Sequence, residues 1–88
     1  MKYKLIYTTK FKKDYKLSVR RGMPTELLKE VITLLQNGQP LPHKMRDHAL
    51  TGDFIGFREC HILPDWLLIY FVEEGPHYAD IVKNRFPL

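Results

Sequence analysis

The stretch FIGFRECHILPDWLLIYFV, residues 54–72, contains the clearest indication of the fold. Its second half, residues 66–72, is continuously apolar, which is typical of a central strand that is buried on both faces. Residues 54–62 have the length and composition of another strand. Between the two, Leu63-Pro64-Asp65 has the residue types of a tight turn. We therefore predict a β-hairpin here, and a last strand at residues 78–82.

Two helices, joined by a tight turn, are predicted before this hairpin. Thr8 or Thr9 can cap the first helix, and Gly22 can end it in the left-handed conformation. Pro24 suits the first turn of the second helix, which ends at Gly38. The apolar positions that recur at helical spacing are Phe11, Tyr15 and Val19 in the first helix and Leu27, Leu28, Val31, Leu34 and Leu35 in the second.

The order of these elements indicates the fold class. Residues 2–7 alternate loosely between charged and apolar side chains, as an edge or half-buried strand does. The resulting order β-α-α-β-β-β predicts a single α+β domain over residues 1–88, in which an N-terminal strand and a two-helix hairpin pack on an antiparallel sheet. Residues 38–53 contain Pro40 and Pro42 and show no periodicity, so we expect a long functional loop there.

The composition limits the class of protein. A chain of 88 residues with 44% apolar residues can build one modest core, which excludes a multidomain enzyme and a large cofactor-binding fold. The single cysteine excludes a disulfide scaffold and fits a reducing compartment. No apolar run reaches the roughly 20 residues of a membrane span, and the first ten residues lack the features of a signal peptide. We expect a small, soluble, cytoplasmic domain without membrane association.

Positive charge is concentrated in residues 10–21, which contain six Lys and Arg residues, Lys12 and Lys13 among them, against the single acidic residue Asp14. The rest of the chain is close to neutral. Such a strip is typical of a protein with a polyanionic or acidic partner. The simpler interpretation is the solvated face of an amphipathic helix, and charge alone does not decide between them.

Three polar residues are expected to meet at one end of the sheet. His61 ends one strand of the hairpin, Asp65 begins the next, and His48 lies in the loop before them. Adjacent strands are about 4.8 Å apart, so these side chains can approach one another. Two imidazoles and a carboxylate can cleave RNA without a metal, because one base deprotonates the ribose 2′-hydroxyl and an acid protonates the leaving 5′-oxygen. The simpler interpretation is of half-exposed histidines beside a turn aspartate.

Other chemistry has weaker support in the sequence. The residues that could form a zinc site are His43, His48, His61, His77 and Cys60. No pair of them has the C-x-x-C or H-x-x-x-H spacing of a structural site, so we expect no metal and no cofactor. Cys60 is most simply a small buried apolar residue. Arg58 forms either an ion pair with Glu59 or a phosphate clamp. The clamp needs a bulge or a twist at the strand end, because alternation places residues 58 and 61 on opposite faces.

Two sequence blocks resemble a known family. Residues 47–52, DHALTG, and residues 57–70, FRECHILPDWLLIY, match the patterns D-H-x-L-x-G and F/Y-R-[DE]-x-H-x-x-P-D-x-[LIV]-[LIV]-[LIV]-Y. These are similar to the YafQ branch of the RelE/ParE toxin superfamily, and with the helical hairpin the resemblance covers residues 2–83.

The resemblance implies a ribonuclease toxin that cuts mRNA in the ribosomal A site and is held inactive by a cognate antitoxin. It also implies two N-terminal helices on an antiparallel sheet. In such families the toxin–antitoxin complex commonly represses its own operon, so operator DNA is expected as a partner only through that complex. Carried over by position, His48, His61 and Asp65 match the catalytic residues, and Lys83 stands where the family usually has an arginine that holds the scissile phosphate.

The C-terminal residues depart from the family pattern. That pattern closes with R-x-G-x-H-x-x-L-F, whereas this sequence has KNRFPL at residues 83–88, with Pro87 near the position of the histidine. The resemblance then implies that Phe86 replaces the aromatic that stacks on a base and that Arg85 adds phosphate-binding charge. Neither residue transfers protons at neutral pH, and His77 is expected at the opposite end of the last strand.

Two alternative functions stay open at this point. One is a catalytically weak or inactive ParE/RelE-like member that acts by protein binding alone, as an antitoxin-bound co-repressor or an inhibitor of a protein target. The other is a generic nucleic-acid-binding module that uses the basic strip, although its aromatics, Phe11 and Tyr15, are also expected in the core. A protein that only binds protein does not need both His48 and His61 at one end of a sheet.

Overall fold

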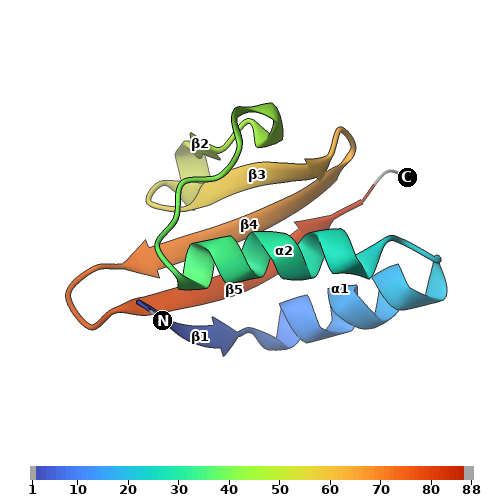
Figure 1. Ribbon diagram of the computed structural model, residues 1–88, viewed down its shortest axis with the longest axis horizontal. Coiled ribbons are helices and arrows are strands. Elements are labelled where there is room, and N and C mark those ends of the chain that lie inside the picture. The colour runs from blue at the N-terminus through green and yellow to red at the C-terminus, as the bar shows by residue number, and fades with distance from the viewer. Residues whose placement is uncertain (1, 87–88) are drawn as a thin grey trace.

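The computed structural model describes residues 2–86, which form two helices packed on one face of a sheet (Figure 1). The elements in chain order are β1 (Lys4–Tyr7), α1 (Thr9–Arg20), α2 (Thr25–Gln36), the 3₁₀ turn η1 (His43–Met45), β2 (His48–Ala49), the 3₁₀ turn η2 (Gly52–Phe54), β3 (Arg58–Leu63), β4 (Trp66–Glu73) and β5 (Tyr78–Arg85). The predicted α+β fold class is confirmed. No helix within residues 2–86 is both long and apolar enough to cross a membrane.

The sheet has the strand order β1-β5-β4-β3-β2, so the predicted hairpin provides its centre. Strands β2 to β5 pair antiparallel, as predicted. Strand β1 pairs with β5 in parallel, with Lys4 opposite Tyr78 and Tyr7 opposite Ile81, so the sheet is mixed rather than wholly antiparallel. A parallel neighbour needs a long crossover connection, and the helical hairpin supplies the first part of it.

The core lies between the helices and one face of this sheet. Leu28 and Val31 of α2 are buried against alternate residues of the central strands, such as Cys60, Leu68 and Ile81. Because side chains alternate along a strand, the residues between these positions point to the opposite face of the sheet. That second face is free of helices, and it carries the candidate site.

The helix boundaries follow the predicted signals. The Thr8 hydroxyl accepts a hydrogen bond from the backbone N–H of Phe11 at 3.0 Å, which caps α1. Gly22 and Gly38 follow the two helices with φ angles of 69° and 67°, in the left-handed conformation that favours glycine. Pro24 lies one residue before α2 begins, in the N-cap position. The predicted helical hairpin is therefore confirmed.

The buried face of α1 differs from the predicted one. Phe11 is buried, but Val19 is 53% exposed, and its expected place in the core is taken by Asp14 and Ser18. The Asp14 carboxylate accepts a hydrogen bond from the backbone N–H of Asn84 in β5 at 3.0 Å. A polar contact between distant parts of the chain thus sets the rotation of α1, and apolar spacing does not reveal it.

The segment predicted as a structureless loop contains short elements. Strand β2 pairs with the start of β3, with His48 opposite Glu59 and Ala49 opposite Arg58. Two residues are too few to give a recognisable strand pattern. Strand β3 begins at Arg58 rather than near residue 54, because η2 occupies residues 52–54.

Candidate active site

Two rows of cross-strand partners lie on the helix-free face of the sheet. The first row runs through His48, Glu59, Ile69 and Lys83 on strands β2, β3, β4 and β5. The second row runs through His61, Leu67 and Arg85. Directly opposite residues point to the same side of a sheet. The two predicted histidines, Lys83 and Arg85 therefore share one face.

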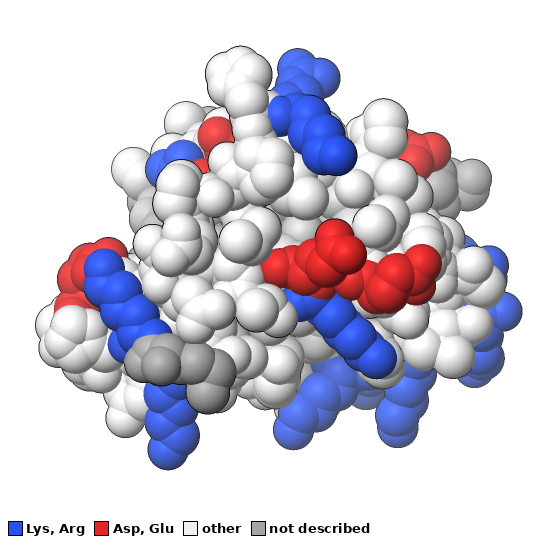
Figure 2. Space-filling model, in the orientation of Figure 1, with Lys and Arg blue, Asp and Glu red and all other residues white. Residues whose placement is uncertain are grey.

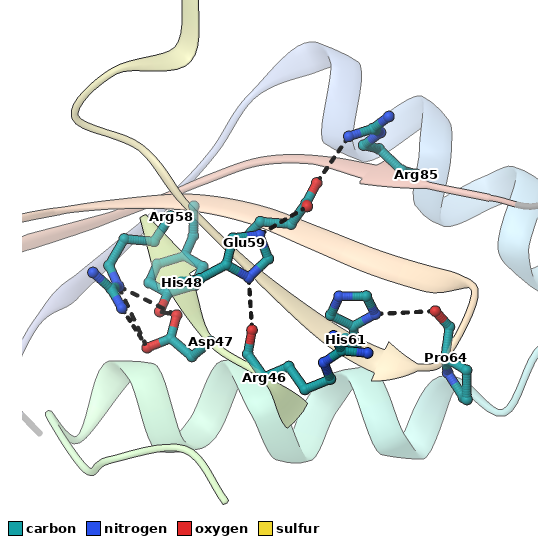
Figure 3. A network of polar contacts seen from close by, with 9 residues as sticks. Arg46, Asp47, His48, Arg58, Glu59, His61, Pro64 and Arg85 are labelled. Carbon is teal, nitrogen blue, oxygen red and sulfur yellow. Dashed lines mark hydrogen bonds and ion pairs between the residues drawn. The ribbon is translucent and has the colours of Figure 1, made fainter. Parts of the chain in front are cut away.

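The two imidazole rings are neighbours with fixed orientations (Figure 3). The ring centres of His48 and His61 are 6.0 Å apart. His48 Nδ1 lies 2.7 Å from the backbone oxygen of Arg46, and His61 Nδ1 lies 3.0 Å from that of Pro64. A carbonyl oxygen only accepts, so each Nδ1 carries a hydrogen and donates it. The opposite nitrogen, Nε2, is then the basic atom of each neutral ring.

Glu59 is a buried carboxylate between His48 and Arg85. It is 5% exposed, with Oε1 3.4 Å from His48 Nε2 and Oε2 3.1 Å from an Arg85 guanidinium nitrogen. A buried carboxylate requires such partners to offset its lost hydration. The Arg58–Glu59 ion pair, one of the two alternatives left open for Arg58, does not form, because residues 58 and 59 point to opposite faces of β3. Since residues 59 and 61 share a face in a regular strand, alternation could have indicated that Glu59 faces the histidine side of the sheet.

Arg58 lies on the helix side and does not face the histidines. Its guanidinium makes a bidentate contact with Asp47, with Nε and a terminal nitrogen each 3.2 Å from a carboxylate oxygen. The Tyr70 hydroxyl donates to the same carboxylate. The hydrogen bonds to Asp47 raise the pKa of Arg58, and burial together with Asp47 raises the pKa of Tyr70. The β-bulge lies after His61, so it does not create the phosphate clamp that the sequence left open.

The remaining cationic candidates lie in two places, the histidine face of the sheet and helix α1. Lys83 is on the histidine face, with Nζ 4.6 Å from the centre of the Phe54 ring. Arg85, on the same face, forms an ion pair with Glu59. Lys12 and Lys13 are exposed on α1, outside the histidine cluster. The structure thus brings two of these four residues to the candidate site.

Phe86 and Asp65 are less closely connected to the histidines. The Phe86 ring stacks on Trp66 at 6.5 Å, and the Arg21 guanidinium lies 5.4 Å from its centre. Phe86 is therefore packed at the edge of the core. Asp65 is exposed in the turn after Pro64, and its side chain has no hydrogen bond or ion pair with any other residue in the described part of the chain. Pro87 lies outside the described residues.

The zinc site considered from the sequence is not assembled. Among residues 2–86, no three or more His, Cys, Asp or Glu side chains are grouped to hold a metal ion. Cys60 is fully buried as expected, and burial raises its pKa to about 12. His77 lies in the turn between β4 and β5, with its ring 6.2 Å from that of Tyr3, at the far end of the sheet from His61.

A surface hollow of about 640 Å³ adjoins both histidines. Its lining comes from the segment before β2, from the first residue of β2 and from one residue of β3. The lining residues are Pro40, Leu41, Pro42, His43, Arg46, Asp47, His48 and His61. Its volume is in the range of small-molecule sites in proteins.

Known proteins resemble this chain over most of its length. Residues 3–83 match the family model described as "Bacterial toxin of type II toxin-antitoxin system, YafQ". The mRNA interferase toxin YafQ of Escherichia coli strain K12 is 43% identical over 82 residues, which cover 83% of this chain and 89% of that protein.

Two solved structures have the same fold. A chain of the E. coli DinJ–YafQ toxin–antitoxin complex has a TM-score of 0.87 and 32% identity, covering 98% of this chain and 93% of that chain. A metal-bound toxin from Helicobacter pylori has a TM-score of 0.89 and 36% identity, covering 96% and 93%. The family resemblance carried by residues 47–52 and 57–70 is thereby confirmed, and this chain belongs to the YafQ family of bacterial toxins of type II toxin–antitoxin systems.

Proposed function

We propose that this chain is a ribosome-dependent endoribonuclease that cuts mRNA by acid–base catalysis without a metal. The proposal is carried by the pair of imidazoles 6.0 Å apart, each held through Nδ1 by a backbone carbonyl. The base must come within about 2.6–3.2 Å of the ribose 2′-oxygen, and the acid must come equally close to the leaving 5′-oxygen on the adjacent phosphorus, which requires close and fixed neighbours. The E. coli relative named an mRNA interferase toxin supports the same activity.

The surroundings of the two rings favour different roles. His61 Nε2 has no hydrogen-bond partner among residues 2–86, which suits a general base. His48 Nε2 faces the Glu59 carboxylate at 3.4 Å, so a protonated His48 forms an ion pair there and suits a general acid. Because these two residues can carry both proton transfers, the proposed reaction needs no histidine at position 87.

The proposed reaction is an internal transesterification. His61 removes the proton from a ribose 2′-hydroxyl, and the 2′-oxygen then forms a bond to the adjacent phosphorus. The bond from phosphorus to the 5′-oxygen of the next nucleotide breaks, and His48 protonates that oxygen. The products are a 2′,3′-cyclic phosphate and a 5′-hydroxyl. Proton exchange with water then removes the extra proton from His61 and returns one to His48.

Lys83 and Arg85 are proposed to stabilise the charge of the crowded phosphate, because both point to the histidine face. Lysine provides charge without the bidentate fork of arginine, so Lys83 contributes less directional binding. Asp65 follows the Pro64 whose carbonyl orients His61, and its exposed carboxylate is proposed to position the substrate or to transfer a proton. Phe86 is assigned no catalytic role, because its ring is stacked on Trp66.

No step is assigned to a metal. The Helicobacter pylori relative is described as metal-bound, but residues 2–86 of this chain contain no cluster of three or more ligating side chains. The donors here therefore do not fit a conventional protein metal site.

A second function, protein binding, has its own support on the helix side. A groove of about 460 Å³ is lined by Tyr7, Phe11, Tyr15, Leu28, Ile32 and the lysines Lys12, Lys16 and Lys29. Lys and Arg side chains project along the edge formed by α1 (Figure 2). An apolar groove with a basic rim fits an amphipathic acidic segment, and we propose the cognate antitoxin as its source. The E. coli relative has been solved with an antitoxin.

The experiment that tests the proposed function is cleavage of a defined mRNA on translating ribosomes by the purified chain. Cleavage with 2′,3′-cyclic phosphate and 5′-hydroxyl ends supports the proposal. Growth arrest and antitoxin binding without any cleavage favour the alternative, in which the chain acts by protein binding alone.

A further inference from the structure

We infer that the hollow beside His61 is a second phosphate-binding subsite, in which Arg46 holds the phosphate next to the one that is cleaved. The inference rests on the proposed function, because it extends the path of the same RNA strand. The hollow combines one guanidinium, three imidazoles and a short apolar wall from residues 40–42. This mixture suits a nucleotide, since its phosphate takes the charged donors and its ribose or base takes the apolar wall.

Arg46 is placed next to His61. Both residues border this hollow and also a second hollow beyond it, which contains Met45 and Pro64. The close-up view shows the Arg46 side chain extending toward His61 (Figure 3). The guanidinium therefore lies beside His61 at the border of the hollow, within reach of a nucleotide that continues past the catalytic pair.

The backbone of Arg46 is unusual and connects the hollow to the catalytic pair. Its φ angle is 50°, in the left-handed region that residues other than glycine rarely adopt. In this conformation its carbonyl accepts the Nδ1 hydrogen of His48. One residue thus orients a catalytic ring through its backbone and presents a cation through its side chain. Such local strain is concentrated at functional sites.

The charge of the hollow favours an anion. Asp47 is the one carboxylate among the lining residues, and it already accepts hydrogen bonds from Arg58 and Tyr70. Its charge is therefore compensated on the helix side. The charge left to the hollow comes from Arg46 and, when protonated, from its imidazoles, including His43, which no proposed step uses. The guanidinium of Arg46 has no ion pair with any residue in 2–86.

The spacing of phosphates along an RNA strand favours RNA over a free anion as the ligand of this hollow. Successive phosphates of one strand are separated by a single ribose. A strand whose scissile phosphate lies between His48 and His61 therefore places an adjacent phosphate close to the rings. Arginine is the side chain best suited to bind it, because its planar fork matches phosphate oxygens.

The test is binding of a trinucleotide with 2′-O-methyl riboses, which cannot be cleaved, followed by NMR of the imidazole protons. We expect the signals of His43, His48 and His61 to shift and that of His77 to stay. Arg46→Gln should weaken binding about tenfold, as expected for loss of one charge-assisted contact. Lys4→Gln, which removes a charge at the opposite edge of the sheet, should change it less than twofold.

The phosphate that Arg46 binds is identified by neutralising each of the two linkages in turn with a methylphosphonate. If Arg46 contacts one of them, that substitution weakens binding to the native chain, and Arg46→Gln then has no further effect. A loss of affinity in Arg46→Gln that is the same whichever of the two linkages is neutral, or no imidazole shift at millimolar trinucleotide, overturns the subsite. These outcomes are separable from failure of the nuclease proposal, because binding of an inert oligonucleotide does not depend on cleavage.

Discussion

The carboxylate of Glu59 lies 3.4 Å from Nε2 of His48, and it is buried on the helix-free face of the sheet. It connects the proposed general acid to Arg85 through its second oxygen. A carboxylate in this position holds the ring in place and provides a counter-charge when Nε2 is protonated. The proposed mechanism therefore predicts that Glu59 affects the rate of cleavage.

Glu59→Gln is expected to lower cleavage roughly tenfold, because a charged hydrogen-bond partner is replaced by a neutral one of the same shape. The measurement is the rate of mRNA cleavage on ribosomes, with thermal unfolding recorded for the same variant. Glu73→Gln, at the end of β4, is the matched control and should be unchanged. Equal rates for both variants and the native chain would show that Glu59 does not contribute to cleavage.

The contact of Asp47 with Arg58 and Tyr70 is expected to hold the segment that carries His48. Asp47→Ala leaves the guanidinium and the buried Tyr70 hydroxyl without their partner, so the free energy of unfolding should fall by about 1–3 kcal/mol. Urea denaturation measures this change, with Asp53→Ala in exposed η2 as the control. A loss equal to that of the control would show that the cluster does not hold the segment.

Cys60 is expected to be unreactive in the folded chain. Its pKa is raised to about 12 by burial, so at pH 8 only about one thiol in 10⁴ is ionised, and reagents also lack access to it. A disulfide reagent should modify the native protein very slowly and the protein in guanidinium at once. Rapid modification of the native protein at pH 8 would contradict the buried position.

Metal independence predicts that cleavage survives removal of tightly bound metal. Toxin treated with EDTA, freed of chelator and added to ribosomes at constant Mg²⁺ should retain its full rate. Adding Zn²⁺ or Cu²⁺ should not increase that rate. A loss after EDTA treatment that either ion restores would show a metal requirement, in line with the metal-bound relative.

Lys12 and Lys13 are predicted to face ribosomal RNA, as the basic strip indicates. Changing both to Glu should weaken ribosome association and reduce the slope of log affinity against log salt, because fewer counterions are released. Lys12 also borders the proposed antitoxin groove, so antitoxin affinity should fall in the same variant. An unchanged salt slope would show that Lys12 and Lys13 do not contact ribosomal RNA and form only a solvated helix face.

The sequence predicts the framework of this fold because local signals fix it. The apolar run at residues 66–72 forms the central strand, and Gly22 and Gly38 end the helices where expected. Contacts between distant residues are what it does not predict. The exposure of Val19 follows from the hydrogen bond between Asp14 and Asn84, which are 70 positions apart.

The same distinction between local signals and contacts of distant residues applies to the candidate site. His48 and His61 were identifiable from their residue type and from two sequence blocks, and they are neighbours in the structure. Their orientation depends on the carbonyls of Arg46 and Pro64, which no side-chain pattern reveals. Neither alternative for Arg58, an ion pair with Glu59 or a phosphate clamp, is formed, since adjacent residues in a strand point to opposite faces.

The most direct test of the central claim is the rate of mRNA cleavage on translating ribosomes by His61→Ala, with His77→Asn as the matched histidine control. Asparagine tolerates the left-handed backbone at residue 77, where φ is 60°. The account predicts that His61→Ala lowers the rate about 10²–10⁴-fold, the usual contribution of a general base, while His77→Asn and the fold are unaffected. Cleavage by folded His61→Ala at the native rate would contradict it.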